Sequence, residues 1–259
     1  MLTQGNIEEE IIRLSDDESY YADNEYITNS MLSKLNKSPL ELYAYMNGDL
    51  DTNTQALNFG KAFHTAILEP EKMENVAVFD GKRKVGKAWD VFHAENHDKI
   101  ILTQDEMTTL ESMFARLSSN PMACEHMMLD DKSTQTEIVN IWENNGLYCK
   151  GKADIVNYDK GVMVDLKTTS NASPREFERS VYKYGYHRLA AYYLDGFGLE
   201  KFTIVAIEKK FPFNMGVYTL SDETIQKGRE EIEDLMKEYH TRFIIEEFNP
   251  DEYCYWETI

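Results

Sequence analysis

Residues 148–169 constrain the fold more than any other stretch of the sequence, because charged residues there interrupt two apolar runs. Asp154 lies in the first run, and Asp165 and Lys167 lie in the second. The intervening residues 157–161 include Asn, Asp and Gly, which favour turns, so the stretch is predicted to be a β-hairpin. Because side chains two apart share one face of a strand, Asp165 and Lys167 point the same way, and the adjacent strand can bring Asp154 beside them.

Two carboxylates held close together repel each other unless a positive charge lies between them. A divalent cation with oxygen ligands is the usual solution, so the hairpin predicts a metal site with Lys167 at its edge. The alternative is a solvated strand edge with an exposed ion pair, which an Asp-x-Lys sequence also allows. The hairpin alone does not decide between these two interpretations.

Matches outside the hairpin favour the metal site. Gly-Lys-Ala-Asp154 followed by Val-Asp165-Leu-Lys167-Thr-Thr resembles the PD-(D/E)XK nuclease superfamily, and within it the RecB-like and RecE-like branch of phage and prophage exonucleases. The resemblance extends over most of the chain, in the order Asn-Glu-Tyr-Ile-Thr-Asn-Ser at 24–30, Phe-Gly-Lys-Ala-Phe-His64, Glu137 ahead of Ile-Trp142, and Tyr186-His187 before Ala-Ala-Tyr-Tyr-Leu-Asp-Gly. Such an ordered set is much more specific than Asp-x-Lys.

We therefore expect a single α/β domain over residues 1–259, in which helices flank a mixed central β-sheet. The resemblance implies a restriction-endonuclease-like core with N-terminal helical additions. The expected catalytic residues are Asp154, Asp165, Lys167, Glu137 and His64. The expected ligands of Mg²⁺ or Mn²⁺ are Asp154, Asp165 and the backbone carbonyl of Leu166, with Glu137 and His64 contributing directly or through water. Lys167 would orient or help deprotonate the attacking water and stabilise the developing negative charge.

The assignments of His64 and Glu137 to the site depend most on the resemblance. His64 lies in a helix predicted over 54–68, and a lone helical histidine is usually packed or solvated. RecB-like nucleases have a histidine on an N-terminal helix that reaches the metal site, in a similar Gly-x-x-x-His setting. Glu137 lies in a strand predicted over 134–142 that returns through a turn to the strand of Asp154, where its charge would be repelled unless a metal were present.

Residues after the hairpin supply candidate substrate contacts. Thr168 and Thr169 are expected to contact phosphate, although threonine is common in strands for propensity alone. A helical segment is predicted over 173–197 with a break near Gly185. The Gln-x-x-x-Tyr motif of RecB-like nucleases aligns there with Leu189 and Tyr193, so the glutamine is missing. The expected substrate-binding set on this segment is Tyr186, His187, Arg188 and Tyr193.

The rest of the sequence gives less specific signals of structure and function. Residues 1–27 are acidic and show little periodicity, so a loose acidic arm is expected there. Ser30 is a candidate cap for a short helix. Further helices are predicted at 39–46, 87–96, 104–117, 121–129 and 222–245, and further strands at 76–79, 202–207 and 215–220.

The charge balance opposes tight binding of nucleic acid. The chain has 27 basic and 46 acidic residues, a net charge of −19, and a field of this sign slows association with DNA. A local basic lining can still form from Lys82, Arg83, Lys84, Lys87, Lys150, Lys152, Arg175, Arg179, Lys183 and Arg188. The three cysteines are too few and too scattered for a disulfide framework or a four-cysteine cluster.

Location and function follow as expectations. The sequence has neither a signal peptide at its start nor an apolar run near the ~18 residues of a membrane span, so a cytoplasmic protein of a bacterial or phage-infected cell is expected, without a membrane partner. The resemblance implies a metal-dependent exonuclease acting on double-stranded DNA ends, with 5′ to 3′ polarity, that supplies single strands to an annealing recombinase. Apolar helix faces and the rings formed by similar exonucleases suggest a homo-oligomer. A structure-specific endonuclease and a non-catalytic acidic interaction protein remain as alternatives.

Overall fold

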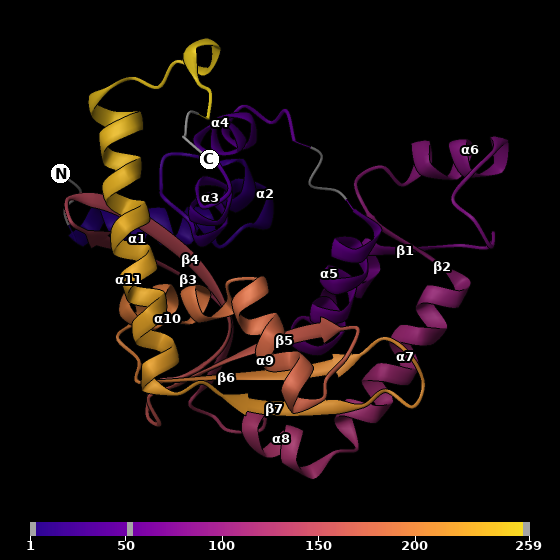
Figure 1. The fold of residues 1–259 in the computed structure, drawn as a ribbon. Helices are drawn as coiled ribbons and strands as arrows, with labels where there is room; N and C mark the ends of the chain where they lie inside the picture. The colour runs from indigo at the N-terminus through magenta and orange to yellow at the C-terminus, as the bar shows by residue number, and fades with distance from the viewer. Residues whose placement is uncertain (1–3, 51–53, 256–259) are drawn as a thin grey trace.

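A five-stranded mixed sheet forms the centre of the molecule (Figure 1). The computed structural model describes residues 4–50 and 54–255. The strands lie in chain order, and only the third and fourth of them run parallel; they are β3 (Thr134–Asn144), β4 (Leu147–Asn157), β5 (Val162–Thr169), β6 (Lys201–Glu208) and β7 (Met215–Thr219). The expected mixed α/β fold is therefore confirmed, including the hairpin of β4 and β5.

Helices cover both faces of this sheet and leave β6 buried between them. Phe202, Ile204 and Ala206 pack into one core, whereas Val205 and Ile207 pack into the other. An almost continuous apolar run is the pattern of a strand that is covered on both faces. The first core is completed by α9 (Pro174–Lys183), α10 (Tyr186–Phe197) and α11 (Asp222–Tyr239), and the second by α5 (Gln55–Leu68), α7 (Gln104–Ser118) and α8 (Pro121–Met127).

The N-terminal segment is helical, so the expectation of a loose arm over 1–27 was wrong for its described part. It forms α1 (Gln4–Leu14) and α2 (Asp17–Ala22), and α3 (Asn29–Leu35) and α4 (Pro39–Met46) follow. Leu14 and Tyr20 are buried against Val139 and Ile141 of β3. A few apolar side chains anchor these otherwise polar helices because the edge of the sheet offers an apolar surface, which local periodicity does not reveal.

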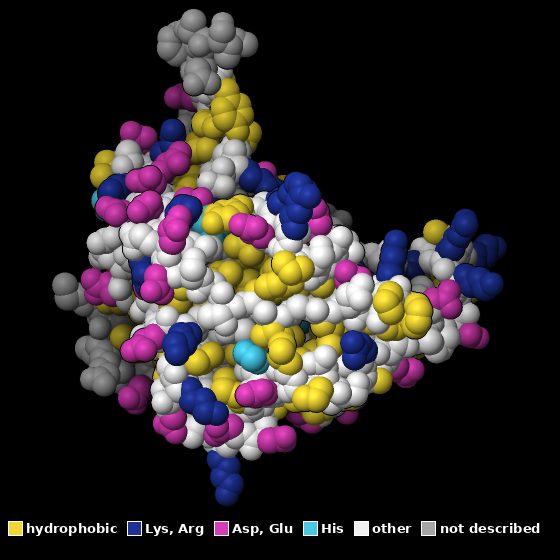
Figure 2. Space-filling view, turned by 60° about the horizontal axis from the view of Figure 1, so that its bottom comes forward, with side chains coloured by type: hydrophobic (Ala, Val, Ile, Leu, Met, Phe, Trp, Pro, Cys, Tyr) yellow, Lys and Arg dark blue, Asp and Glu magenta, His cyan; other side chains and the backbone are white. Residues whose placement is uncertain are grey.

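A second, smaller sheet joins β1 (Val76–Phe79) to β2 (Ile100–Thr103) in parallel. The strand β2 was not expected, because four residues give little periodic signal and their partner is distant in sequence. Between the two strands, α6 (Lys87–Glu95) buries none of its residues. Figure 1 shows this segment projecting from the side toward which β5 points, and in Figure 2 basic side chains gather on the projection.

Most other predicted elements agree with the structure within a few residues. The short helix near Ser30 begins at Asn29 and is capped by Thr28, and the expected break at Gly185 separates α9 from α10. The helix predicted over 222–245 continues beyond α11 as a π-helical turn, His240–Ile245. Short 3₁₀ turns occur at Pro70–Asn75 and Pro250–Glu252. Over the described ranges, every helix is too short or too polar to cross a bilayer.

Candidate active site

The candidate site lies where β4 and β5 stop pairing with each other. Their ladder ends at Ile155 opposite Val164, and continuing the same register places Asp154 opposite Asp165. At this fork the Asp154 Oδ2 accepts a hydrogen bond of 2.8 Å from the backbone N–H of Leu166. A carboxylate thus takes the position of a backbone acceptor, and two acidic side chains meet at the opening between the strands.

Only one of the two carboxylate oxygens of Asp165 has a hydrogen-bond partner within the described part of the protein. Its Oδ1 accepts a hydrogen bond of 2.7 Å from the Lys167 Nζ, as expected for residues two apart on one strand face. Its Oδ2 is buried and has no hydrogen-bond partner. Burial raises the pKa of Asp165, and the Lys167 ammonium opposes this only in part. A buried carboxylate oxygen without a donor is costly, so this atom is suited to a cation.

His64 connects the helix α5 to both strands. Its Nε2 lies 2.9 Å from the carbonyl oxygen of Leu166, and its Nδ1 lies 3.5 Å from the Asp154 Oδ2. Burial alone would lower the pKa of His64, but the Asp154 carboxylate outweighs it and the pKa is raised. Burial opposes ionisation of Asp154, yet His64 lowers the pKa of this carboxyl below its ordinary value. Because both ring nitrogens face acceptors, the charged imidazolium is favoured in the absence of metal.

Glu137 completes the cluster from the neighbouring strand. The ladder between β3 and β4 is interrupted at this residue, which has a φ of 52°, while the pairs on either side keep their register and so place it across from Asp154. Burial and the Asp154 charge raise the pKa of Glu137, although the Lys152 ammonium lies 3.0 Å from its Oε2. One ligand atom each from His64, Glu137 and Asp154 lies within 4.8 Å of the others.

These side chains fit a divalent cation. Carboxylate and carbonyl oxygens are the donors that Mg²⁺ and Mn²⁺ prefer, and the unpartnered Oδ2 of Asp165 adds a further one. Asp165 does not fall within the compact group of three, and the carbonyl of Leu166 is already held by His64. Among the described residues, the positive charge near these acids comes from His64, Lys152 and Lys167.

The expected substrate-binding residues divide into two groups. The Lys167 Nζ lies 5.6 Å from the ring centroid of Tyr186, and Tyr193 is close enough to Asp154 for that charge to raise its pKa after the larger effect of burial. Thr168 and Thr169 are partly exposed at the end of β5, beyond Lys167. Tyr186 and Tyr193 therefore lie beside the candidate site, and the role of Thr168 and Thr169 as phosphate contacts stays a prediction.

His187 and Arg188 are not brought to the site, so their assignment as DNA contacts was wrong. They are 2% and 4% exposed. Each forms a contact of 2.8 Å to the carboxylate of Glu231 on α11, and Arg188 also donates to Ser33 on α3. Their role is to join three helices. The sequence signal was misleading because polar residues on a helix can face a neighbouring helix as readily as a ligand.

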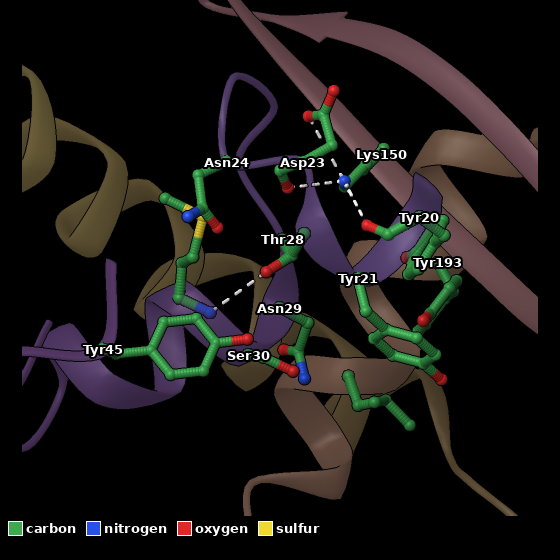
Figure 3. A pocket seen from close by; sticks show the side chains of 12 residues that line it. Tyr20, Tyr21, Asp23, Asn24, Thr28, Asn29, Ser30, Tyr45, Lys150 and Tyr193 are labelled. Carbon is green, nitrogen blue, oxygen red and sulfur yellow. Dashed lines mark hydrogen bonds and ion pairs between the residues drawn. The ribbon is translucent and has the colours of Figure 1, made fainter. Parts of the chain in front are cut away.

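A cavity of about 80 Å³ is lined by residues of the N-terminal helices, β4 and α10 (Figure 3). Tyr21 and Tyr193 line it, and the pKa of each is raised first by burial and then by charges that include Asp154. Leu189, which stands where the glutamine was expected, also lines this cavity, so it presents an apolar side chain there. The Oδ1 of Asn29 is buried in this region, and none of the described residues bonds to it.

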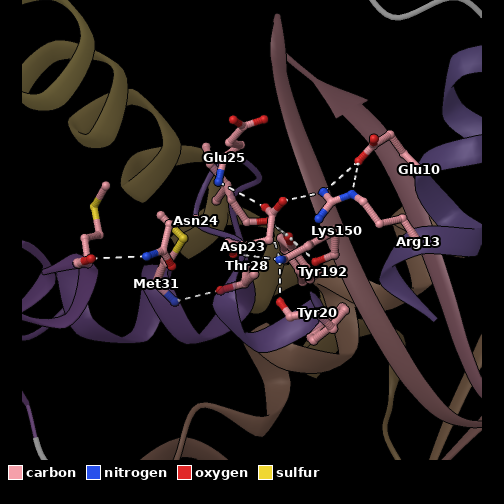
Figure 4. A network of polar contacts seen from close by, with 12 residues as sticks. Glu10, Arg13, Tyr20, Asp23, Asn24, Glu25, Thr28, Met31, Lys150 and Tyr192 are labelled. Carbon is pink, nitrogen blue, oxygen red and sulfur yellow. Dashed lines mark hydrogen bonds and ion pairs between the residues drawn. The ribbon is translucent and has the colours of Figure 1, made fainter. Parts of the chain in front are cut away.

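A network of ion pairs ties the N-terminal helices to β4 (Figure 4). Lys150 is 1% exposed, and its Nζ donates at 2.7 Å to the carbonyl oxygens of Tyr20 and Asp23 and lies 3.3 Å from the Asp23 Oδ1. Arg13 contacts the second oxygen of Asp23 at 2.5 Å. Lys150 therefore cannot contribute to the expected basic lining.

Lys152 was expected in a basic lining and Asp17 was not expected near the site, but both are neighbours of the acidic cluster. Lys152 forms ion pairs with Glu137 and with Asp17 of α2, and burial, which lowers its pKa, is outweighed by these carboxylates. A signal for Lys152 existed, since it lies two residues before Asp154 on one strand face. No sequence pattern indicated that Asp17 would lie near the site, because it belongs to a segment that was expected to be loose.

The fold and the acidic fork define a PD-(D/E)XK nuclease-type domain, which confirms the resemblance seen in the sequence. Residues 28–254 match the family described as a PDDEXK-like domain of unknown function, and the chain belongs to that family. No curated protein matches the sequence.

One solved structure supports the same fold. A crystal structure of a candidate exonuclease from Eubacterium rectale is 19% identical over 100% of this chain and 96% of that chain, with a TM-score of 0.65. A phage-related exonuclease from Haemophilus somnus is 12% identical over 76% of this chain and 97% of its own, with a TM-score of 0.33, too low to carry an argument. At these identities the likeness concerns the fold alone.

Proposed function

We propose that this protein is a metal-dependent DNA exonuclease that hydrolyses phosphodiester bonds from duplex ends, with 5′ to 3′ polarity, in phage-type recombination. The observation that carries the proposal is the fork between β4 and β5, where Asp154 and Asp165 meet beside Lys167. Membership of the PDDEXK-like family supports a nuclease. The description of the Eubacterium rectale protein as a candidate exonuclease supports action from ends.

The side chains of the site have separate roles in this proposal. Asp154, Asp165, Glu137, His64 and the carbonyl of Leu166 would hold Mg²⁺ or Mn²⁺. When bound, such an ion lowers the pKa of a water molecule and offsets negative charge on the scissile phosphate. Lys167 keeps its proton at neutral pH, because the Asp165 and Asp154 carboxylates raise its pKa despite burial.

A protonated Lys167 can orient the attacking water and stabilise the charge that develops on phosphate. It is less suited to removing a proton from that water, since its pKa is raised. Tyr186 lies over the same ammonium group and Tyr193 flanks Asp154, so both can fix the position of the substrate strand. Thr168 and Thr169 extend the site toward the next phosphate along the strand.

The proposal also covers partners and location. Duplex DNA ends are the substrate, an annealing recombinase receives the single strand, and the protein acts in the cytoplasm of a bacterial or phage-infected cell as a homo-oligomer. A closed oligomer that threads a DNA end would direct hydrolysis to ends. These statements rest on the resemblance and on apolar helix surfaces such as Phe114 and Met122, which are 41% and 60% exposed.

The test compares end-labelled linear duplex with relaxed, covalently closed circular DNA under equal Mg²⁺, Mn²⁺ or EDTA. We expect digestion of the linear duplex alone, only with metal, with label at the 5′ end released first. Cleavage of intact circles at the same rate would support an endonuclease instead. Absence of hydrolysis under all metal conditions, by a protein that still binds DNA, would support the non-catalytic alternative.

A further inference from the structure

The segment between β1 and β2 forms a basic arm, defined here as residues 80–99. Its loop at 81–87 contains four basic residues and no acidic residue, in a chain of net charge −19. The acidic residues of the arm lie outside this loop, at Asp80, Asp90, Glu95 and Asp98. The arm therefore carries a local positive surface on a protein that otherwise repels polyanions.

The basic arm projects from the body of the protein. Its helix α6 buries no residue, and Trp89 and Phe92 of this helix hold it by packing against Phe79 with ring centroids 5.3 Å apart. Lys82, Arg83 and Lys87 are exposed. The fourth basic residue, Lys84, turns inward, where its Nζ donates to the carbonyl of Ile101 at 2.7 Å and pairs with Glu106 at 3.2 Å.

The basic arm lies on the side of the molecule toward which β5, the strand of Asp165 and Lys167, runs. In Figure 1 the arrow of β5 points toward the side from which β1, β2 and α6 project. The helix α5, which positions His64 at the site, also packs against β2. The helix α5 therefore contacts both the candidate active site and β2, the strand that follows the arm.

Two further basic residues follow β6, beside the end of β5. The backbone N–H of Lys209 donates to the carbonyl of Thr169, at the end of β5. The Nζ of Lys209 lies 5.9 Å from the ring centroid of Phe59 on α5. Lys210 follows and is exposed. Positive charge therefore continues from the end of the strand that carries Lys167 toward the side where the arm projects.

We propose that the basic arm binds the phosphate backbone of duplex DNA, through Lys82, Arg83 and Lys87, while the end of one strand occupies the candidate active site. This inference rests on the proposed nuclease function and adds the duplex as the partner of a second surface. Contacts with phosphate carry no sequence information, and they make affinity depend on salt. The arm would thus hold the duplex that remains to be digested, whatever its sequence.

The test is a charge-removal variant, Lys82→Ala with Arg83→Ala and Lys87→Ala, in a Lys167→Ala background that prevents hydrolysis. Binding of a fluorescent blunt-ended duplex is measured by anisotropy in Mg²⁺ over a range of salt concentrations. Losing three phosphate contacts should make the negative slope of log K against log salt shallower by about 2 to 3. Binding at low salt should weaken on the order of ten- to a hundredfold.

A matched control removes the same charge from the opposite end of the sheet. Lys132 precedes β3, Lys160 lies in the turn before β5, and Lys201 pairs with Val162 at the start of β5. The triple variant Lys132→Ala, Lys160→Ala, Lys201→Ala should bind duplex like the parent. Equal loss of affinity in both triple variants would show an effect of net charge alone and would overturn the proposal, as would an unchanged slope in the arm variant.

The result separates this inference from the proposed function. If the parent with Lys167 intact hydrolyses DNA but the arm variant binds duplex with the parent's salt slope, the arm proposal fails and the nuclease stands. If the parent never hydrolyses DNA but loses duplex affinity with the arm, the arm proposal stands and the nuclease fails. Thermal melting of each variant confirms folding, which the exposure of all three arm residues favours.

Discussion

The Nε2 of His64 lies 2.9 Å from the carbonyl oxygen of Leu166, although 102 positions separate the two residues in the chain. The same imidazole faces the Asp154 carboxylate at 3.5 Å through its other nitrogen. The imidazole of His64 therefore lies between two groups that are candidate metal ligands. A divalent cation at this site would compete with that charge for the same oxygens.

Lys167→Ala and Asp165→Ala should each lower DNA hydrolysis by a factor on the order of 10² to 10⁴, because each removes a charged group from the reacting centre. Asp165→Ala should change the melting temperature little, since burial opposes the ionisation of Asp165 and is unfavourable to folding. Hydrolysis of linear duplex and thermal unfolding are measured in parallel. Lys201→Ala, at the far end of the sheet, serves as the control, and an undiminished rate in either site variant would exclude this mechanism.

Divalent metal should stabilise the folded protein through the acidic fork. A metal that binds only the native state at 100 times its dissociation constant adds about 2.7 kcal/mol to the free energy of unfolding. Asp154→Asn should lose most of the rise in melting temperature produced by Mg²⁺ or Mn²⁺. The control is Asp131→Asn, which removes a partly exposed carboxylate that pairs with Lys160 at 2.8 Å. An equal metal-induced shift in the wild type and in Asp154→Asn would place the ion elsewhere.

Gly228→Ala should destabilise the packing of α11 against α10. A Cβ at Gly228 would lie 2.2 Å from the carbonyl oxygen of His187, which is backbone and cannot move aside without shifting a helix. We expect a loss of about 1–3 kcal/mol in the free energy of unfolding, measured by urea denaturation.

The helical Gly60 provides a matched control for that prediction. No atom of the described residues outside this helix lies within 4 Å of a Cβ built there. Gly60→Ala should therefore be neutral or stabilising by up to about 1 kcal/mol, because alanine favours the helix. Similar effects of the two substitutions would contradict the close approach of α10 and α11.

Asp23→Asn should lower the free energy of unfolding by about 1.5–3 kcal/mol at neutral pH, because it removes a charged partner from the buried Lys150. Burial lowers the pKa of Lys150 and Asp23 opposes this, so the variant should lower it further. Between the folded and unfolded pKa values the unfolded chain binds more protons, so stability rises with pH. The deficit of Asp23→Asn should consequently shrink as pH rises toward the ordinary lysine pKa.

The double variant Asp23→Asn with Lys150→Met tests the cause of that pH dependence. With no ammonium to neutralise, its stability relative to the wild type should lack the recovery at high pH. Urea denaturation at a series of pH values measures all three proteins. A pH-independent deficit in Asp23→Asn would show that the carboxylate of Asp23 acts through Arg13 instead, which it contacts at 2.5 Å.

The sequence by itself determined the features that depend on short-range periodicity. Alternation along a strand places Lys167 beside Asp165, and turn residues close the hairpin that brings Asp154 opposite them. The positions of most helices and strands also followed, because caps, glycines and apolar spacing act over a few residues.

Only the tertiary structure decided which distant groups meet. The contact of His64 with Leu166, the pairing of Lys152 with Asp17, and the burial of His187 and Arg188 against Glu231 all join separate elements. The type of a polar residue does not reveal whether its side chain faces a ligand, a neighbouring helix or water. Its partner depends on how helices and sheet pack, and that packing is set by burial of apolar surface contributed from the whole chain.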